Sequence, residues 1–176
     1  MLTSALAAIG GGLAAGLTLS DCAKGISSAF PAEGRMQPVP CSQGVTFIRD
    51  DFKAPAWTVR PLLDQLRDAK SHRKIFVLGT IPDCQRKEDE TKQLASAALE
   101  VADIAIFTGR FASAALKARK PGTESRLHTF SRTIDVANFL RSIHQEGDLI
   151  ILEGTNKKDH LSRIPLSLSQ TVNCWV

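Results

Sequence analysis

The chain has 176 residues, of which 43% are hydrophobic and 23% charged, and this composition excludes a disordered chain, a collagen and a coiled coil. The net charge of +4 suits an anionic small ligand. Aromatic residues make up only 6% and tyrosine is absent, which disfavours a base-stacking surface. We therefore expect no nucleic-acid partner.

The cysteines are dispersed at positions 22, 41, 84 and 174. They form no C-x-x-C motif, and no histidine stands at a zinc-finger spacing from them, so we expect no metal site. Unpaired thiols are typical of a reducing compartment, which predicts a cytoplasmic protein. The alternative for Cys174 is a ligand whose partners lie beyond the last residue.

Residues 2–19 carry no charge and are rich in Ala, Gly, Ser and Thr. A signal peptide would begin with Lys or Arg, and a membrane span would be more strongly apolar. We therefore favour two helices over a membrane anchor, with a break near Gly16 and with Ser20 or Asp21 capping the second helix.

The segment Phe30-Pro31-Ala32-Glu33-Gly34 is typical of a linker, because Pro ends a helix and Gly opens a turn. It divides the chain into a short helical segment, residues 1–34, and a domain, residues 35–165. Residues 166–176 form a tail to which the sequence assigns no role.

Within the domain, hydrophobic spacing predicts a regular alternation of strands and helices. The strands expected after a hairpin of 35–41 and 44–50 are 74–81, 104–109, 126–130 and 148–154. The helices expected between them contain residues 59–66, 94–101, 111–119 and 136–143, the last capped by Ser131 or Thr133. This order predicts an α/β fold with flanking helices and a mostly parallel sheet, to which the hairpin adds an antiparallel strand.

In such sheets, ligands bind beyond the carboxyl ends of the strands. Asp50, Asp51 and Lys53 follow the first long strand and could bind a ribose, a metal or a phosphate, or simply form a polar loop that caps the next helix. Thr155, Asn156, Lys157 and Lys158 follow the last strand and could form an anion cradle, although two solvated lysines explain the pattern equally. No dinucleotide-binding glycine motif follows any strand.

The order of five segments resembles the Mur ligase family. They are ALAAIGGGLAAGLTLSDCAKGISSAFPAEGRM (5–36), GVTFIRDDFKAPAW (44–57), RKIFVLGTI (73–81), ALEVADIAIFTG (98–109) and GDLIILEGT (147–155). The first segment resembles the last helices of the central ATPase domain. The others resemble the carboxyl-terminal Rossmann-like domain, which receives the incoming amino acid or peptide.

The resemblance implies a ligase that joins a carboxylate to an amine through an acyl phosphate, with ATP and Mg²⁺ in the intact enzyme, as in peptidoglycan biosynthesis. The phosphate-binding motif G-x-x-x-x-G-K-[ST] is absent from this chain. We therefore expect the chain alone to bind no cofactor and to be inactive without the ATPase domain, which is its implied partner.

The resemblance also implies site residues. Arg35 matches the linker arginine that reaches the nucleotide, Asp51 the acidic residue that contacts the ribose, and Lys53 a lysine near the γ-phosphate. Thr155 and Lys157 fall in the loop that holds the incoming substrate in some members. Phe52 to Trp57 departs from the Tyr and Asn-Pro of the peptide-adding members, and Asn156 to His160 replaces a glycine-rich loop, so the substrate stays open.

Two other functions are compatible with the sequence. The first is a non-catalytic binding or regulatory module that kept the fold. The second is a receiver-like signalling domain, suggested by the acidic pair after one strand. The receiver hypothesis is the weaker, because Thr108-Gly109 follows the IAIF strand where a receiver needs an Asp.

Overall fold

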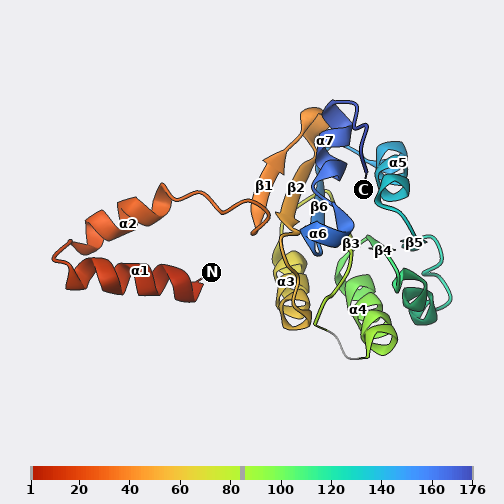
Figure 1. The fold of residues 1–176 in the computed structure, drawn as a ribbon, viewed down its shortest axis with the longest axis horizontal. Helices are drawn as coiled ribbons and strands as arrows, with labels where there is room; N and C mark the ends of the chain where they lie inside the picture. Colours follow the sequence, from red (N-terminus) through yellow and green to blue (C-terminus); the bar gives the residue numbers. More distant parts are fainter. Residues whose placement is uncertain (1, 84–85, 176) are drawn as a thin grey trace. The chain divides into compact units, whose positions relative to one another are not determined.

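The computed structural model describes residues 2–83 and 86–175. It divides into two compact units, one ending at Pro31 and the other beginning at Ala32 (Figure 1). Cys84 lies outside the described residues. Cys22 and Cys41 form no disulfide, which agrees with the expectation of reduced thiols.

The first unit is a pair of helices, α1 (Leu2–Ala14) and α2 (Leu19–Ser27). Gly16 separates them with a φ of +88°, in the left-handed region that favours glycine. The cap of α2 is Thr18, whose Oγ1 accepts a hydrogen bond from Asp21 N at 3.1 Å, and not Ser20 or Asp21 as predicted. Thr18 takes this role because its backbone is extended (φ −76°, ψ 158°), whereas Ser20 and Asp21 already lie within the helix.

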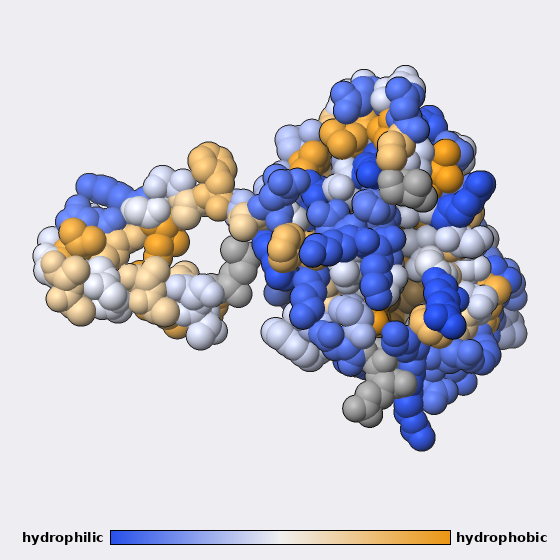
Figure 2. Space-filling model, in the orientation of Figure 1, coloured by the Kyte–Doolittle hydropathy of each residue, from blue (hydrophilic) through white to orange (hydrophobic). Residues whose placement is uncertain are grey.

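The helical unit leaves large apolar side chains exposed. α1 has no buried residue, and apolar residues spread over the face of this unit that Figure 2 shows. The exposed leucines are Leu2, Leu6, Leu13, Leu17 and Leu19. Across the described residues, no helix has the length and hydropathy needed to cross a membrane.

The second unit is the predicted α/β domain. Its strands are β1 (Gln37–Pro40), β2 (Thr46–Asp50), β3 (Arg73–Leu78), β4 (Ile104–Thr108), β5 (Leu127–Phe130) and β6 (Asp148–Glu153). Its helices are α3 (Ala56–Asp68), α4 (Lys87–Val101), α5 (Thr133–Ile143), α6 (Asn156–Asp159) and α7 (Arg163–Ser169), with 3₁₀ turns η1 (Ser42–Gly44) and η2 (Ala112–Ala118).

The strands form one sheet in the order β1-β2-β6-β3-β4-β5. β1 pairs antiparallel with β2, and the other pairs are parallel, which confirms the predicted Rossmann-like arrangement with an antiparallel edge. The sheet faces two hydrophobic cores, because alternate strand residues point to opposite sides. Phe76 and Leu78 of β3 pack with α3, α4 and η2, whereas Ile75 and Val77 pack with α5 and the start of α7.

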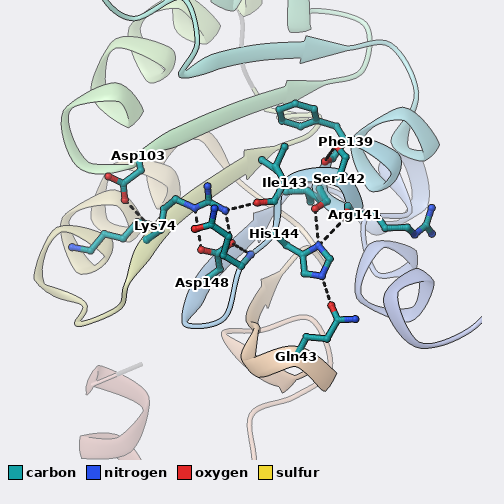
Figure 3. A network of polar contacts seen from close by, with 12 residues as sticks. Gln43, Lys74, Asp103, Phe139, Arg141, Ser142, Ile143, His144 and Asp148 are labelled. Atoms are coloured by element: carbon teal, nitrogen blue, oxygen red, sulfur yellow. Dashed lines mark hydrogen bonds and ion pairs between the residues drawn. The ribbon is translucent and has the colours of Figure 1, made fainter.

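A polar network fixes the amino-terminal edge of the sheet (Figure 3). Arg73 donates two hydrogen bonds to the buried Asp148, at 3.0 and 2.7 Å, and a third to the carbonyl of Ile143. The bonds to Asp148 raise the pKa of Arg73, so its guanidinium stays charged. His144 continues the network through a hydrogen bond to the Gln43 side chain. These contacts join β3 and β6 to the end of α5 and to the η1 turn.

Three details depart from the predicted elements. The segment predicted as a helix at 111–119 is the 3₁₀ segment η2. α6 and α7 were not predicted, and α7 runs across residue 165, with Ile164, Pro165 and Ser167 buried. The tail that follows residue 165 therefore begins inside a helix that packs against α5.

Candidate functional site

The candidate site lies at the carboxyl-terminal edge of the parallel strands. β6 stands between β2 and β3 in the sheet, and the helix before β6 covers one face while α3 and α4 cover the other. This reversal of winding is a topological switch point, where ligands of open α/β sheets bind. The loops after β2, β6, β3 and β4 meet there.

The linker reaches this edge through a tight turn at Gly34. Gly34 has a φ of +66°, and its carbonyl accepts a hydrogen bond from Phe52 N at 3.1 Å. A Cβ at this position would lie 3.0 Å from Asp51 Oδ1, so only glycine allows this approach without displacing the β2 end. The turn places the next residue, Arg35, beside the loop that follows β2.

Arg35 and Lys53 lie together. The Arg35 guanidinium stands over the Phe52 ring, with 4.9 Å between Cζ and the ring centroid, and donates a hydrogen bond to the Lys53 carbonyl at 3.1 Å. Lys53 is exposed and reaches Asp83 Oδ2 at 3.9 Å, a contact that solvent screens strongly. Two cationic side chains therefore line one side of the strand edge.

Asp51, which follows β2, does not expose its carboxylate to solvent at the strand end. Its side chain is fully buried and accepts a hydrogen bond from Arg49 Nε at 3.1 Å. Burial raises the pKa of Asp51, although the Arg49 charge opposes the shift. Arg49 also contacts Glu33 at 3.3 Å, so Asp51 closes a linker-to-strand network instead of facing solvent.

Asp50 and Glu153 form a second acidic pair at the same edge. They end β2 and β6 as direct register partners. Glu153 is fully buried, and its Oε1 accepts a hydrogen bond from Thr58 Oγ1 at 3.1 Å. Burial, followed by the neighbouring Asp50 charge, raises the pKa of Glu153 to about 9. Glu153 therefore carries the proton at neutral pH, and its Oε2 has no hydrogen-bond partner in the described protein.

The loop after β6, where we expected an anion cradle, binds a carboxylate of the protein itself, that of Asp159. Asp159 is buried and accepts hydrogen bonds from Thr80 N at 2.7 Å, Thr80 Oγ1 at 2.6 Å and Thr155 N at 2.8 Å. Its backbone carbonyl accepts a further bond from Thr133 Oγ1. One group of the predicted cradle, the Thr155 amide, thus binds the Asp159 carboxylate together with the Thr80 amide and hydroxyl. These bonds and the Thr133 bond tie the β3 and β6 loops to α5.

Thr155 and Lys157 are consequently not equivalent. The Thr155 hydroxyl donates to the Thr80 carbonyl at 3.1 Å and is turned into the loop. Lys157 lies exposed on α6, and its side chain forms no hydrogen bond with the described residues. Asn156 N donates a hydrogen bond to the Phe52 carbonyl at 3.4 Å, which brings the loop after β6 beside the loop after β2.

Sequence reasoning missed Glu153 and the structural role of Asp159. A carboxylate that closes the apolar run DLIIL was a usable signal, because a charge at the end of a buried strand needs a partner. Asp159 offered no local signal, since its donors on Thr80 are 79 residues away.

We tested whether these residues fit the ligands that the resemblance implies. A hollow of about 130 Å³ lies between the linker, Phe52 and Asn156, next to Arg35 and Lys53. Arg35 and Lys53 are the residue types that bind phosphate groups, so they fit a nucleotide. No group of three or more His, Cys, Asp or Glu within 2–83 and 86–175 has a metal-binding geometry, so no step is derived through a metal.

The sequence matches the family described as "Mur ligase, glutamate ligase domain" over residues 34–156. The chain belongs to this family. The match covers the sheet and the strand-end loops described above, from the Gly34 turn to Asn156. No curated protein matches the chain.

Solved structures show the same architecture. MurF from Acinetobacter baumannii is 26% identical with a TM-score of 0.75, over 95% of this chain and 36% of that one. UDP-N-acetylmuramoylalanyl-D-glutamyl-2,6-diaminopimelate–D-alanyl-D-alanyl ligase from the same organism is 25% identical with a TM-score of 0.73, over 90% and 34%. MurF from Thermotoga maritima in complex with ADP is 16% identical with a TM-score of 0.65, over 87% and 34%. The chain therefore spans about a third of the length of these proteins.

Proposed function

We propose that this chain is the substrate-receiving domain of an ATP-dependent Mur-type ligase, which forms an amide bond between a carboxylate and an amine. It acts together with an ATPase domain and is inactive without it. The observation that carries the proposal is the pairing of Arg35 and Lys53 at the carboxyl edge of a Mur ligase domain. Its similarity to MurF supports a role in peptidoglycan synthesis in the cytoplasm.

In this proposal Arg35 and Lys53 hold the phosphate groups. ATP would supply the phosphoryl group that activates the carboxylate substrate. The Arg35 guanidinium is held by the Phe52 ring and the Lys53 carbonyl, so it meets a phosphate with little loss of conformational freedom. Two cations at this edge stabilise the negative charge that develops during phosphoryl transfer. Lys53 is the candidate catalytic residue, because its ammonium is exposed and its weak contact with Asp83 is easily exchanged.

Asp51 remains the proposed ribose contact, with one condition that the structure adds. Its carboxylate has to leave Arg49 before it can accept a hydrogen bond from a ribose hydroxyl. Docking of the ATPase domain is the step at which that exchange would occur, since Glu33 of the linker competes for the same Arg49. If no exchange occurs, Asp51 positions Arg49 and the linker.

For the incoming substrate we propose Thr155 and Lys157. Lys157 is the stronger candidate, because it is exposed near the β2 and β6 loops, whereas the Thr155 hydroxyl is used within the protein. A second function, a non-catalytic binding module, is favoured by one observation. Asp159 accepts the hydrogen bond of the Thr155 amide, one group of the predicted cradle, so this loop has less capacity for an external anion than its sequence suggests.

Amide formation distinguishes the two functions. The chain is assayed with an ATPase domain, in one polypeptide or as two, with ATP and a panel of amino acids and peptides. We expect ADP release to depend on both parts and on the amine. ADP release that is unchanged when this chain is omitted, or when the amine is omitted, would favour the non-catalytic module.

A further inference from the structure

The sheet has two edge strands, β1 and β5, and their outer edges differ (Figure 1). On β1, the Cys41 amide donates a hydrogen bond to the Val45 carbonyl at 2.8 Å, so alternate residues from Cys41 back to Gln37 face β2. The residues that face outward are therefore Pro38 and Pro40, which have no amide hydrogen. Proline at both outward positions prevents another strand from pairing with β1.

β5, at the other edge, has no such protection. The Ala105 amide donates a hydrogen bond to the Arg126 carbonyl at 2.8 Å, and in this register the even-numbered residues of β5 face β4. Leu127 and Thr129 therefore direct their main-chain groups outward. Leu127 is fully buried, and its carbonyl accepts a hydrogen bond from Arg119 Nη2 at 3.0 Å. Thr129 is partly exposed, and neither its amide nor its carbonyl has a partner among the described residues.

A hollow of about 300 Å³ lies beside this unpaired part of the strand. Thr129 and Phe130 of β5 and the following Ser131 line it, together with Ala112 and Ser113 of η2. When an extended segment is added to a sheet, its main chain pairs with the edge strand, and pockets beside that strand take its alternate side chains. The Thr129 main chain and the hollow therefore have the arrangement that recognises an extended polypeptide.

The chain around this edge is basic. Arg119 and Lys120 follow η2 and are exposed, and Arg126 precedes β5. The segment between them contains one carboxylate, Glu124, and none of these four side chains forms an ion pair within residues 2–83 and 86–175. The Arg119 guanidinium lies at the strand edge itself, through its bond to the Leu127 carbonyl. Acidic side chains on an added segment would compensate these charges.

Two other occupants of the edge fit less well. β5 lies four strand spacings from β2, about 19 Å, so this surface is separate from the edge where Arg35 and Lys53 stand. A reacting substrate would have to be bound close to that pair. A second copy of the chain, paired through the same strand about a two-fold axis, would bring two basic edges together, and their like charges would repel.

We propose that the β5 edge binds an extended, acidic segment of a partner protein by strand addition, with Thr129 as the pairing residue and Arg119 beside an acidic side chain. The Thr129 amide donates to a carbonyl of the segment, and the Thr129 carbonyl accepts from one of its amides. One side chain of the segment enters the hollow beside η2. The inference uses none of the residues assigned to the ligase reaction and does not depend on the proposed function.

The test uses the 176-residue chain and a capped hexapeptide of alternating glutamate and valine, at constant ionic strength. In ¹H–¹⁵N correlation spectra the peptide should shift the Thr129 amide signal saturably. Hydrogen exchange at Thr129 should slow about tenfold or more at saturation, because the amide gains an acceptor. The same peptide with lysine in place of glutamate should bind several times more weakly. A version methylated at every amide nitrogen keeps the charges and loses the donors, so it should not bind.

Three variants locate the site. Thr129→Pro gives β5 the protection that β1 already has and removes no bond to β4, so the fold should persist while affinity falls about fivefold or more. Arg119→Gln can still donate to the Leu127 carbonyl but lacks the charge, and it should weaken binding severalfold. Lys92→Gln removes an exposed charge on α4 and should leave affinity unchanged. If Thr129→Pro does not fold, Thr129 exchange in the wild type and the affinity of Arg119→Gln decide the matter.

The same measurements can overturn the proposal. The absence of a saturable shift, unchanged exchange at Thr129, or equal binding of the methylated peptide would exclude strand addition. Equal binding of the lysine peptide, or wild-type affinity in Arg119→Gln, would exclude an acidic partner. Thr129 exchange that is already slow without peptide and becomes faster on dilution would identify a second copy of the chain as the occupant, which also contradicts the proposal.

Discussion

Asp50 and Glu153 end neighbouring parallel strands as register partners, and burial raises the pKa of both carboxyl groups, that of Glu153 to about 9. Glu153 is fully buried, so its neutral form is the one compatible with the fold. The edge on which the candidate nucleotide residues stand thus carries one negative charge from this pair instead of two.

The proton that Glu153 keeps in the folded state predicts a pH-dependent stability. The pKa of Glu153 is about 9 in the folded state, against 4.5 for an ordinary glutamate, so the folded protein holds a proton that the unfolded chain has lost. Stability should therefore be highest below pH 4.5 for this group and should fall as the pH rises toward 9. Glu153→Gln keeps a neutral donor and removes this dependence. In urea unfolding at pH 6, 7 and 8, the free energy of unfolding of the variant minus that of the wild type should rise by up to about 1.4 kcal/mol per pH unit.

A constant difference between the two proteins across this range would show that Glu153 is already ionised in the fold. Glu146→Gln, an exposed residue, is the matched control and should run parallel to the wild type.

Asp159 should be among the most sensitive polar residues. Asp159→Ala leaves the half-buried Thr80 and Thr155 amide groups without their acceptor, and we expect a loss of about 2–4 kcal/mol in the free energy of unfolding. Asp64→Ala removes an exposed carboxylate on α3 and should change the stability by less than about 0.5 kcal/mol. Chemical denaturation measures both. A loss in Asp159→Ala no larger than in the control would show that the three hydrogen bonds contribute no net stability.

Gly34 and Gly122 offer a controlled comparison of backbone strain with side-chain crowding. Both have a positive φ, +66° and +86°, but only a Cβ at Gly34 meets other atoms, 3.0 Å from Asp51 Oδ1. Gly34→Ala should therefore destabilise the protein by about 1–2 kcal/mol more than Gly122→Ala, which has only the left-handed backbone to accommodate. Thermal unfolding of both variants tests this, and equal losses would remove the crowding argument.

The helical unit should promote self-association. Its exposed leucines form an apolar surface of the kind that marks interaction sites. Light scattering should show the whole chain associating with concentration, and a version beginning at Ala32 remaining a monomer. A whole chain that is equally monomeric would contradict this expectation.

The sequence predicted the architecture well because buried strands and helices with one buried face alternate regularly along the chain. The runs KIFVLGTI and IAIFTG became the central strands β3 and β4, and Leu62, Leu63 and Leu66 became the buried face of α3. The short α7 was missed because Arg163 to Ser169 has Pro165 and two serines in a seven-residue helix, whose stability comes from packing on α5 and not from helix propensity.

The sequence predicted where the site lies, but not which of its residues pair with one another. Arg35 and Lys53 were expected at the strand edge, and the Gly34 turn brings them there. The partners of Asp51, Glu153 and Asp159 depend on contacts between segments far apart in sequence, which residue types alone do not specify. Asp51 consequently pairs with Arg49.

The most direct test of the central claim is the turnover of a ligase that joins this chain to an ATPase domain, compared in the wild type, Arg35→Ala and Lys53→Ala. Lys70→Ala, an exposed lysine away from the strand edge, serves as the control. If both cations stabilise phosphoryl transfer, each site variant should lower kcat about 100-fold or more while the melting temperature stays that of the wild type. Wild-type turnover in both site variants would contradict the account.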